Sequence, residues 1–290
     1  ILVCRCDREI SKSDIRKISV FCNVDEDSVI QAIDVDTIYA VPKDLKINGL
    51  DVAVLNALGK STFPKSNLRK WNKVVDRIRK PTGEVTIGVV GKYLELNDAY
   101  KSLFEALTHG GVSNNVKVKI KNIDTDKLEK NKNKTLFNGV NGLLVPGGFG
   151  KRGSEGKIFA SKHARENKIP FFGICFGMQM AVVDVSRNLL EYKSASSSEF
   201  GKTDTPVIGL LTEWLKDEEI QKRDFESEYG GTMRLGSYPA ILKKGSKVRN
   251  IYGSKKINER HRHRYEVNMS FVDDLERVGL KFVGMSPDGL

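Results

Sequence analysis

The sequence lacks several features that would place it in common classes of protein. None of its apolar runs approaches the ~20 consecutive residues that a membrane-spanning helix needs, so we expect no membrane partner. The opening residues, ILVCRCDREI, have neither the basic leader nor the small-residue cleavage site of a secretory signal peptide. No G-x-x-x-x-G-K-[ST] phosphate-binding loop occurs in the chain. We expect a cytoplasmic protein, and no P-loop lies within this sequence.

Cysteine is scarce, and its placement argues against a metal site. Cys4, Cys6, Cys22 and Cys175 form no C-x-x-C pair and have no repeated histidine partner, so we expect no zinc or other metal. Cys4 and Cys6 lie two apart on one face of a predicted strand, a poor geometry for bonding each other. Free thiols are typical of a reducing, cytoplasmic setting.

Positive charge exceeds negative charge, with 48 lysines and arginines against 37 aspartates and glutamates, a net charge of +11. Such an excess can attract nucleic acid, or nucleotides and other acidic ligands. Much of it is dispersed lysine, however, as in VKVKIKNID (116–124), where the alternation predicts a strand with one wet face. We therefore expect no nucleic-acid partner.

Residues 1–84 predict the end of one domain and a linker. Short apolar runs at 1–6, 18–22 and 36–42 precede a predicted helix at 47–59, which ends at Gly59. From residue 64 to residue 84 the segment is basic, and its apolar residues recur at helical spacing before Pro-Thr-Gly closes it. We interpret 1–63 as part of one domain and 64–84 as a linker with a short amphipathic helix. The apolar residues of that helix are Leu68, Trp71, Val75 and Ile78.

Residues 85–290 predict an α/β domain, because buried-type strands alternate with helices. Such alternation implies a mostly parallel sheet with helices on both faces, and ligands bind at the carboxyl ends of its strands. Pro146-Gly147-Gly148 and Cys175 both fall at such ends. The predicted strands are 85–90, 116–120, 141–148 and 169–175, and the helices are 99–109 (capped by Asp98 and stopped by Gly110-Gly111), 156–167 and 178–190.

Gly173-Ile174-Cys175-Phe176-Gly177 has the G-x-nucleophile-x-G form of a nucleophile elbow. A sharp strand-to-helix turn needs small residues on both sides, and the free N–H groups of the helix N-terminus favour a thiolate. The alternative is a buried structural cysteine whose glycines allow close helix–strand contact. We favour the catalytic interpretation.

Pro146-Gly147-Gly148 ends a neighbouring strand and offers backbone amides near Cys175. Two such loops at adjacent strand ends can form an oxyanion hole. Taken alone, the segment is better explained as an ordinary glycine-rich turn.

PGGFG (146–150) followed by GICFGMQ (173–179) is similar to the class I (triad) glutamine amidotransferases, a flavodoxin-like fold. GEVTIGVVGKYLELNDAYKSLFEALTHGG, ERHRHRYEVN, RCDREI and RKISVFCNV narrow the resemblance to the CTP synthase family, over the whole chain. The resemblance implies that 1–63 is the C-terminal part of a P-loop-type synthetase (amidoligase) domain and that 85–290 is the amidotransferase domain. The implied reaction is the ATP-dependent amination of UTP to CTP, a ligase reaction that uses ammonia from glutamine.

The resemblance also implies roles for individual residues. Cys175 is the nucleophile that forms a γ-glutamyl thioester, and the amides of Gly148 and Phe176 form the oxyanion hole. The family usually has Leu at Phe176, a change that leaves the backbone amide in place. Glu199 would hold the α-amino group of glutamine and Arg264 its α-carboxylate. The residues expected to bind glutamine are Gly148, Phe176, Gly177, Met178, Gln179, Glu199 and Arg264.

For nucleotides, the resemblance assigns Lys17 to the phosphates of UTP or CTP, and Ile33, Asp34 and Val35 to the adenosine of ATP. The family usually has Lys at Ile33, and Asp34 can also be read as a simple turn residue. GGTMRLG (230–236) resembles a lid that the activator GTP influences. The family further implies Mg²⁺ sites mostly outside this sequence, feedback inhibition by CTP, and a homotetramer.

The catalytic histidine and glutamate of the family, an H-P-E motif, are not found. None of the four histidines, His109, His163, His261 and His263, is followed two residues later by Glu or Asp. His263 and Glu266, three apart on a predicted strand, lie on opposite faces, so we reject them as a pair. We expect the motif beyond Leu290, the sequence to be a piece of a longer protein, and the piece alone to be nearly inactive.

Two other functions are compatible with parts of the sequence. Another triad amidotransferase would feed ammonia to a different acceptor, but it would not carry residues 1–63 with Lys17 and FCNV. A non-catalytic scaffold would explain the missing histidine, but it has no physical need for Cys175, Gly148, Glu199 and Arg264 together.

Overall fold

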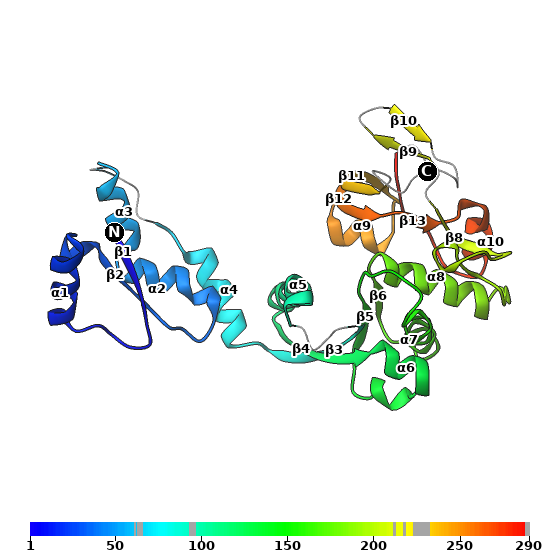
Figure 1. The fold of residues 1–290 in the computed structure, drawn as a ribbon, viewed down its shortest axis with the longest axis horizontal. Helices are drawn as coiled ribbons and strands as arrows, with labels where there is room; N and C mark the ends of the chain where they lie inside the picture. The colour runs from blue at the N-terminus through cyan, green and yellow to red at the C-terminus, as the bar shows by residue number, and fades with distance from the viewer. Residues whose placement is uncertain are drawn as a thin grey trace. The chain divides into compact units, whose positions relative to one another are not determined.

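The structure is a computed structural model that describes residues 1–60, 62, 66–92, 97–210, 213–216, 219–222 and 233–287 (Figure 1). The chain divides into two compact units. The first contains Ile1–Glu84 and Glu105–Val118, and the second contains Val85–Phe104 and Lys119–Leu290.

The first unit begins with a β-α-β arrangement. Strand β1 (Leu2–Cys6) pairs in parallel with β2 (Val29–Ile33), and helix α1 (Lys12–Cys22) and the 3-10 turn η1 (Glu26–Ser28) connect them. Ser11 caps α1 by accepting a hydrogen bond from the Asp14 amide. The apolar run at 18–22 lies in the last turns of α1, where Val20 and Phe21 are exposed.

The helix that the sequence predicted at 47–59 begins later in the structure, at Leu50. Helix α2 (Val41–Ile47) follows the turn η2 (Ile38–Ala40), and α3 (Leu50–Ala57) follows a break at Gly49. Gly49 has a φ of 81°, a conformation that a helix interior does not allow and that glycine adopts readily. The apolar run at 36–42 therefore enters helical turns.

Helix α4 (Arg69–Arg79) is the amphipathic helix expected in the basic segment. Val75 is buried, and the Trp71 indole nitrogen donates a hydrogen bond to the carbonyl oxygen of Tyr39 at 2.7 Å. These contacts attach α4 to the first unit.

The second unit is built on a four-stranded sheet in the order β4-β3-β5-β6. Strands β3 and β5, and then β5 and β6, pair in parallel, which agrees with the predicted α/β fold. The boundaries between the two units fall within β3, α5 and β4. The strands are β3 (Gly83–Gly91), β4 (Val116–Asp124), β5 (Gly142–Val145) and β6 (Phe171–Gly173), and the associated helices are α5 (Lys101–Ser113), α6 (Thr125–Asn131), α7 (Ser154–Glu166) and α8 (Phe176–Asn188).

Two hydrophobic clusters flank the elements that carry the glycine-rich segments. One contains Val90, Leu143 and Val145 of β3 and β5 with apolar residues of α6 and α7. The other contains Phe176, Met180 and further residues of α8. An ion pair joins α7 to α8: the fully buried carboxylate of Asp184 accepts from the Arg165 guanidinium at 3.0 Å. Both helices are thereby fixed beside the sheet.

Smaller sheets complete the second unit. Strand β8 (Pro206–Leu210) pairs with β7 (Ser196–Ser197) and antiparallel with β13 (Tyr265–Val267), while β11 (Arg234–Leu242) pairs antiparallel with β12 (Lys256–His263) and β14 (Gly284–Met285). The remaining elements are β9 (Glu213–Lys216), β10 (Glu219–Lys222), α9 (Lys247–Tyr252) and α10 (Val272–Arg277).

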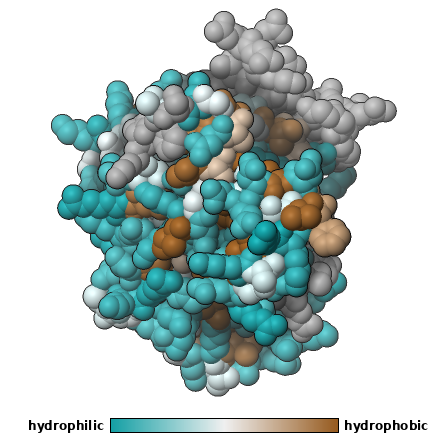
Figure 2. Space-filling model, turned by 90° about the vertical axis from the view of Figure 1, so that its left-hand side faces the viewer, coloured by the Kyte–Doolittle hydropathy of each residue, from teal (hydrophilic) through white to brown (hydrophobic). Residues whose placement is uncertain are grey.

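The face of the molecule drawn in Figure 2 is mainly hydrophilic. In the face drawn in Figure 2, hydrophobic residues (brown) are scattered among hydrophilic ones (teal). Single exposed apolar residues of this kind are normal on folded proteins. Across the described ranges, no helix has the length and apolar character needed to cross a bilayer.

Candidate active site

Cys175 stands at the turn between β6 and α8, with backbone angles φ 50° and ψ −107°. A side chain other than glycine in this region costs of order 1–3 kcal/mol, and such strain is concentrated at functional sites. The structure therefore contains the sharp strand-to-helix turn that the sequence predicted.

The glycines on either side of Cys175 are required by close backbone contacts. A Cβ atom on Gly177 would lie 2.0 Å from the carbonyl oxygen of Val145, and one on Gly173 would lie 2.6 Å from the Gly177 carbonyl carbon. Neither contact is possible, because the obstructing atoms belong to the backbone. The two glycines let α8 start directly against β5.

The Pro146-Gly147-Gly148 loop lies beside Cys175 because β5 and β6 are adjacent and in register. Val145 pairs with Gly173, and the Ile174 amide donates to the Val145 carbonyl at 2.9 Å. A Cβ on Gly147 would lie 3.7 Å from the Cys175 Cβ. The two glycine-rich segments thus meet at one edge of the sheet.

The electrostatic environment of Cys175 differs from the expectation based on the helix N-terminus. Burial raises the pKa of the Cys175 thiol, and the negative charge of Glu199 acts in the same direction. A hydrogen bond from the Phe176 backbone amide and the positive charge of Lys157 act to lower it. Burial is the largest of these effects, so the thiol needs a base or a cation to become a thiolate.

Glu199 lies in the turn η5 (Ser198–Phe200), and its side chain contacts the glycine-rich loop. Its carboxylate oxygen Oε1 accepts a hydrogen bond from the Gly150 amide at 2.7 Å. Its negative charge also acts to raise the pKa of the Cys175 thiol.

Gln179 is buried, and its side chain bonds to protein backbone. Its side-chain Nε2 donates to the carbonyl oxygen of Tyr265 at 2.7 Å, and its backbone amide donates to the carbonyl oxygen of Cys175 at 3.0 Å. Arg264 immediately precedes Tyr265, between β12 and β13. Gln179 therefore ties the helix that carries Cys175 to the segment that carries Arg264.

A cavity of about 890 Å³ opens beside the elbow. Cys175, Met178 and Gln179 line it, together with Arg234 and His263, whereas Arg264 does not. Its size suits a small metabolite. Residues 230–232 of the predicted lid lie outside the described residues, and Arg234, also in that segment, is buried.

The histidines that line this cavity are paired with each other. His261 Nδ1 and His263 Nε2 are 2.8 Å apart. Burial lowers the pKa of His263 to about 4, with the nearby charges of His261 and Arg234 acting the same way. Glu266 instead lies 3.4 Å from Arg234. His263 ends β12 and Glu266 lies in β13, so the two residues stand on different strands and not, as the sequence predicted, on one.

The other two histidines contact other parts of the protein. His109 Nε2 lies 2.7 Å from the Tyr39 hydroxyl in the first unit, and the His163 ring stacks on Phe137 at 4.3 Å between centroids.

Lys157 is a site residue that sequence reasoning missed. It lies on α7, is 2% exposed, and donates from Nζ to the Pro146 carbonyl at 3.2 Å. The sequence gives little indication of this residue, because lysine is common in the segment. Its position among the buried residues of α7 is known only from the structure.

In the first unit, the residues expected to bind nucleotides lie on α1 and at the end of β2. The Lys17 ammonium lies 3.1 Å from Asp14 on exposed surface. Asp34 accepts a hydrogen bond from Arg5 Nε at 2.9 Å, and its amide donates to the Cys6 carbonyl. Ile33 ends β2 and Val35 follows Asp34, so three of the four residues share one strand end.

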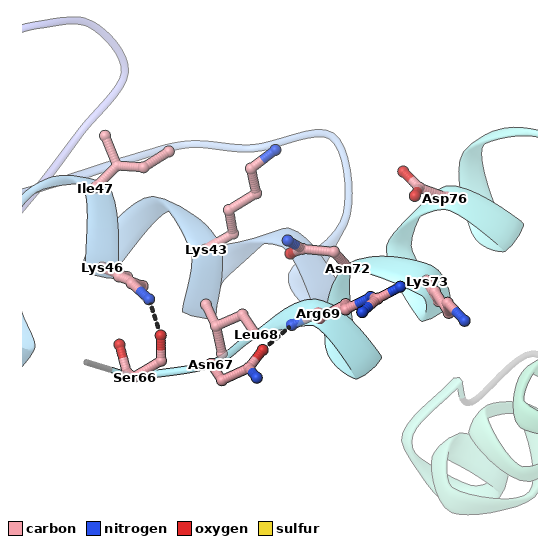
Figure 3. A pocket seen from close by; sticks show the side chains of 10 residues that line it. All are labelled: Lys43, Lys46, Ile47, Ser66, Asn67, Leu68, Arg69, Asn72, Lys73 and Asp76. Carbon is pink, nitrogen blue, oxygen red and sulfur yellow. Dashed lines mark hydrogen bonds between the residues drawn. The ribbon is translucent and has the colours of Figure 1, made fainter. Parts of the chain in front are cut away.

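A basic pocket of about 820 Å³ also occurs in the first unit (Figure 3). Lys43, Lys46, Arg69 and Lys73, from α2 and α4, line it. Lys46 donates to the Ser66 carbonyl, and Asn67 accepts from the Arg69 amide. None of the four residues expected to bind nucleotides lines this pocket.

Comparison with known families identifies the fold. The family model described as "Glutamine amidotransferase class-I" matches residues 95–289. The chain belongs to the class I glutamine amidotransferases. The model "CTP synthase N-terminus" matches residues 1–60, so the resemblance to the CTP synthase family is confirmed as well.

Two proteins similar to this chain are named CTP synthase. The chain is 57% identical over 290 residues to a CTP synthase of Rhizobium leguminosarum bv. trifolii and 55% identical to one of Paramagnetospirillum magneticum, and it covers 54% and 53% of their lengths. It thus spans about half the length of these class I amidotransferase relatives. A solved structure, the Trypanosoma brucei CTPS glutaminase domain with bound acivicin, is 35% identical with a TM-score of 0.61, over 70% of this chain and 75% of that one.

Proposed function

We propose that this chain carries the glutaminase site of a glutamine-dependent CTP synthase, which supplies ammonia for the ATP-dependent amination of UTP to CTP. The observation that carries the proposal is the strained Cys175, held at a strand-to-helix turn beside the glycine-rich loop after β5. The match of residues 1–60 to CTP synthase favours UTP as the acceptor over the acceptors of other amidotransferases.

In the proposed reaction, the sulfur of Cys175 attacks the γ-carbonyl carbon of glutamine. The carbon–nitrogen bond of the side-chain amide breaks, and the leaving nitrogen takes up the proton that the thiol has given up, so that ammonia leaves. A γ-glutamyl thioester remains until water adds to it and releases glutamate and the free thiol. The Phe176 amide already donates toward the sulfur, and with the Gly148 amide it would stabilise the oxyanion of the tetrahedral intermediate.

For the substrate, we propose that Glu199 binds the α-amino group and Arg264 the α-carboxylate of glutamine. Glu199 supports this role by its position beside the loop that carries Gly148. Gly177 and Met178 would contribute backbone beside the substrate. Gln179 would act mainly by orientation, since its side chain is bonded to Tyr265.

The nucleotide roles remain part of the proposal. Lys17 would contact the phosphates of UTP or CTP, and Ile33, Asp34 and Val35 the adenosine of ATP. The proposal also includes GTP as an activator and CTP as a feedback inhibitor. It further includes a homotetramer and a cytoplasmic location. Within the described residues, no three metal-ligating side chains are grouped to hold an ion, and no step is assigned to Mg²⁺.

The test is covalent labelling of the full protein that contains this chain by 6-diazo-5-oxo-norleucine, an electrophile that mimics glutamine. We expect one adduct, located at Cys175 by peptide mass spectrometry, and slower labelling when glutamine competes. Cys175→Ser should remove the adduct, and Cys22→Ser, which changes an exposed cysteine of the first unit, should not. Labelling elsewhere, or none with the wild type, would refute the glutaminase proposal.

A further inference from the structure

The ammonium of Lys157 lies among three parts of the candidate active site. Its Nζ donates to the carbonyl oxygen of Pro146 at 3.2 Å. It stands 4.8 Å from the centroid of the Phe176 ring, and a Cβ on Gly148 would lie 3.2 Å from it. One lysine from α7 therefore contacts the glycine-rich loop and the first residue of α8.

The first consequence concerns the oxyanion-hole loop. Pro146 is the residue before the Gly147-Gly148 amides, and its carbonyl belongs to the same peptide group as the Gly147 amide. A hydrogen bond from Lys157 to this carbonyl fixes the orientation of that peptide plane. The bond thereby orients the Gly147 amide, and it gives the flexible glycine peptides that follow one fixed starting point.

The second consequence concerns charge. Within the described ranges, no carboxylate forms an ion pair with Lys157, although the residue is 2% exposed. Burial lowers the pKa of Lys157 to about 8, and the positive charge of Lys92 acts the same way. Cys175 is the group whose negative form acts to raise it. The thiolate is therefore the anion that this cation can stabilise.

The other charged groups that face the thiol do not replace this cation. Glu199, from η5, is negative and raises the pKa of Cys175. Lys92, which follows β3, acts on Lys157. Lys157 is thus the cation that acts directly to lower the pKa of Cys175.

We propose that Lys157 is a positioning residue for the reaction at Cys175. Its ammonium orients the Pro146–Gly148 loop toward the sulfur and stabilises the thiolate. The proposal rests on the proposed glutaminase function, and it deepens that function by naming the cation that activates the nucleophile.

The test measures how fast iodoacetamide alkylates Cys175 as a function of pH, by peptide mass spectrometry on the full protein. Lys157→Met keeps the length of the side chain and removes its charge. Near pH 7, where Lys157 is protonated, we expect alkylation of Cys175 to be up to about tenfold slower in the variant, and the two profiles should converge well above pH 8, where the wild-type lysine loses its charge. Cys22, exposed on α1, serves as the internal reference in the same samples.

Two further variants separate charge from packing. Lys157→Gln keeps a hydrogen-bond donor but not the charge, so alkylation of Cys175 near pH 7 should slow as in Lys157→Met. Lys157→Arg keeps the charge and should recover part of the effect. Lys162→Met, which changes a lysine on the same helix that is 40% exposed, should leave the profile unchanged.

Glutamine turnover provides the second readout. For Lys157→Gln we expect a lower kcat with an unchanged KM, since the lysine contacts no substrate. The proposal would be overturned if Lys157→Met and Lys157→Gln both had the same alkylation profile and the same kcat as the wild type. That result is distinct from failure of the glutaminase proposal, in which the wild type itself neither hydrolyses glutamine nor reacts with its analogue at Cys175.

Discussion

Replacing Lys157 by methionine is expected to stabilise the second unit near neutral pH. Burial lowers the pKa of Lys157 from its usual 10.5 to about 8, so folding must bury a charge that water would solvate better. At about 1.4 kcal/mol per pKa unit, this difference corresponds to a cost of about 3 kcal/mol. Methionine removes the cost but also the hydrogen bond to Pro146, worth roughly 2 kcal/mol for a charged donor. The expected net gain is about 1 kcal/mol near pH 7.

The sign of the pH dependence follows from proton binding. Below a pH of about 8, the lysine is protonated in both the folded and the unfolded state, and the full cost applies. Between about 8 and 10.5, the unfolded chain holds a proton that the folded protein has released, so the free energy of unfolding of the wild type rises with pH. The advantage of the variant should therefore shrink by about 1 kcal/mol between pH 7 and pH 9.

Pulse proteolysis across a urea gradient measures this difference, with peptides from α7 and α8 used to report the second unit alone. Wild type, Lys157→Met and the exposed-site control Lys162→Met would be compared near pH 7 and near pH 9. A variant that is less stable than the wild type by the same amount at both pH values would refute the reasoning. It would mean that Lys157 contributes packing and a hydrogen bond without an electrostatic cost.

Three further substitutions test the packing of the elbow and its supports. Gly177→Ala should lower the free energy of unfolding by more than about 4 kcal/mol or prevent folding, because its Cβ would lie 2.0 Å from a β5 carbonyl oxygen. The control Gly110→Ala, in open space on α5, should raise the free energy of unfolding by about 0.5 kcal/mol. Similar soluble yields and melting temperatures for the two variants would contradict this expectation. Cys175→Gly should raise stability by about 1 kcal/mol through release of the positive φ, and an unchanged urea midpoint would show that the turn is unstrained. Asp184→Asn should lower the free energy of unfolding by about 3 kcal/mol, because it leaves Arg165 without a carboxylate. Glu166→Gln, at a half-exposed ion pair, should lower it by less than about 0.5 kcal/mol. Equal losses of stability in thermal unfolding would argue against a buried ion pair.

The features that the sequence could predict are those with local causes. The strand at β6, the turn at Cys175 and the helix after it follow from an apolar run, two glycines and helical spacing. The predicted stop of α5 at Gly110-Gly111 was wrong, since the helix continues to Ser113. Gly111 is glycine for a tertiary reason: a Cβ there would lie 2.6 Å from the Val116 carbonyl oxygen. No local pattern distinguishes such a glycine from a helix stop.

The electrostatics of the site could not be read from the sequence, because they depend on burial by distant segments. A helix N-terminus favours a thiolate, yet the pKa of Cys175 is raised, since burial outweighs the backbone amide. For the same reason the sequence indicated neither Lys157 nor the backbone partner of Gln179. Their partners, the carbonyls of Pro146 and Tyr265, lie 11 and 86 residues away in the chain.

The register between β5 and β6 has a consequence for insertions and deletions. The two strands are four and three residues long, and each leads directly into a glycine-rich segment of the site. One residue added inside β6 would displace Cys175 by about 3.3 Å along the strand and reverse the faces of the side chains around it. Length changes should therefore be tolerated at the α7–β6 connection around Asn167 and Lys168 but not between Phe171 and Cys175. A library of single-residue insertions, sorted by labelling of Cys175, would map this boundary directly.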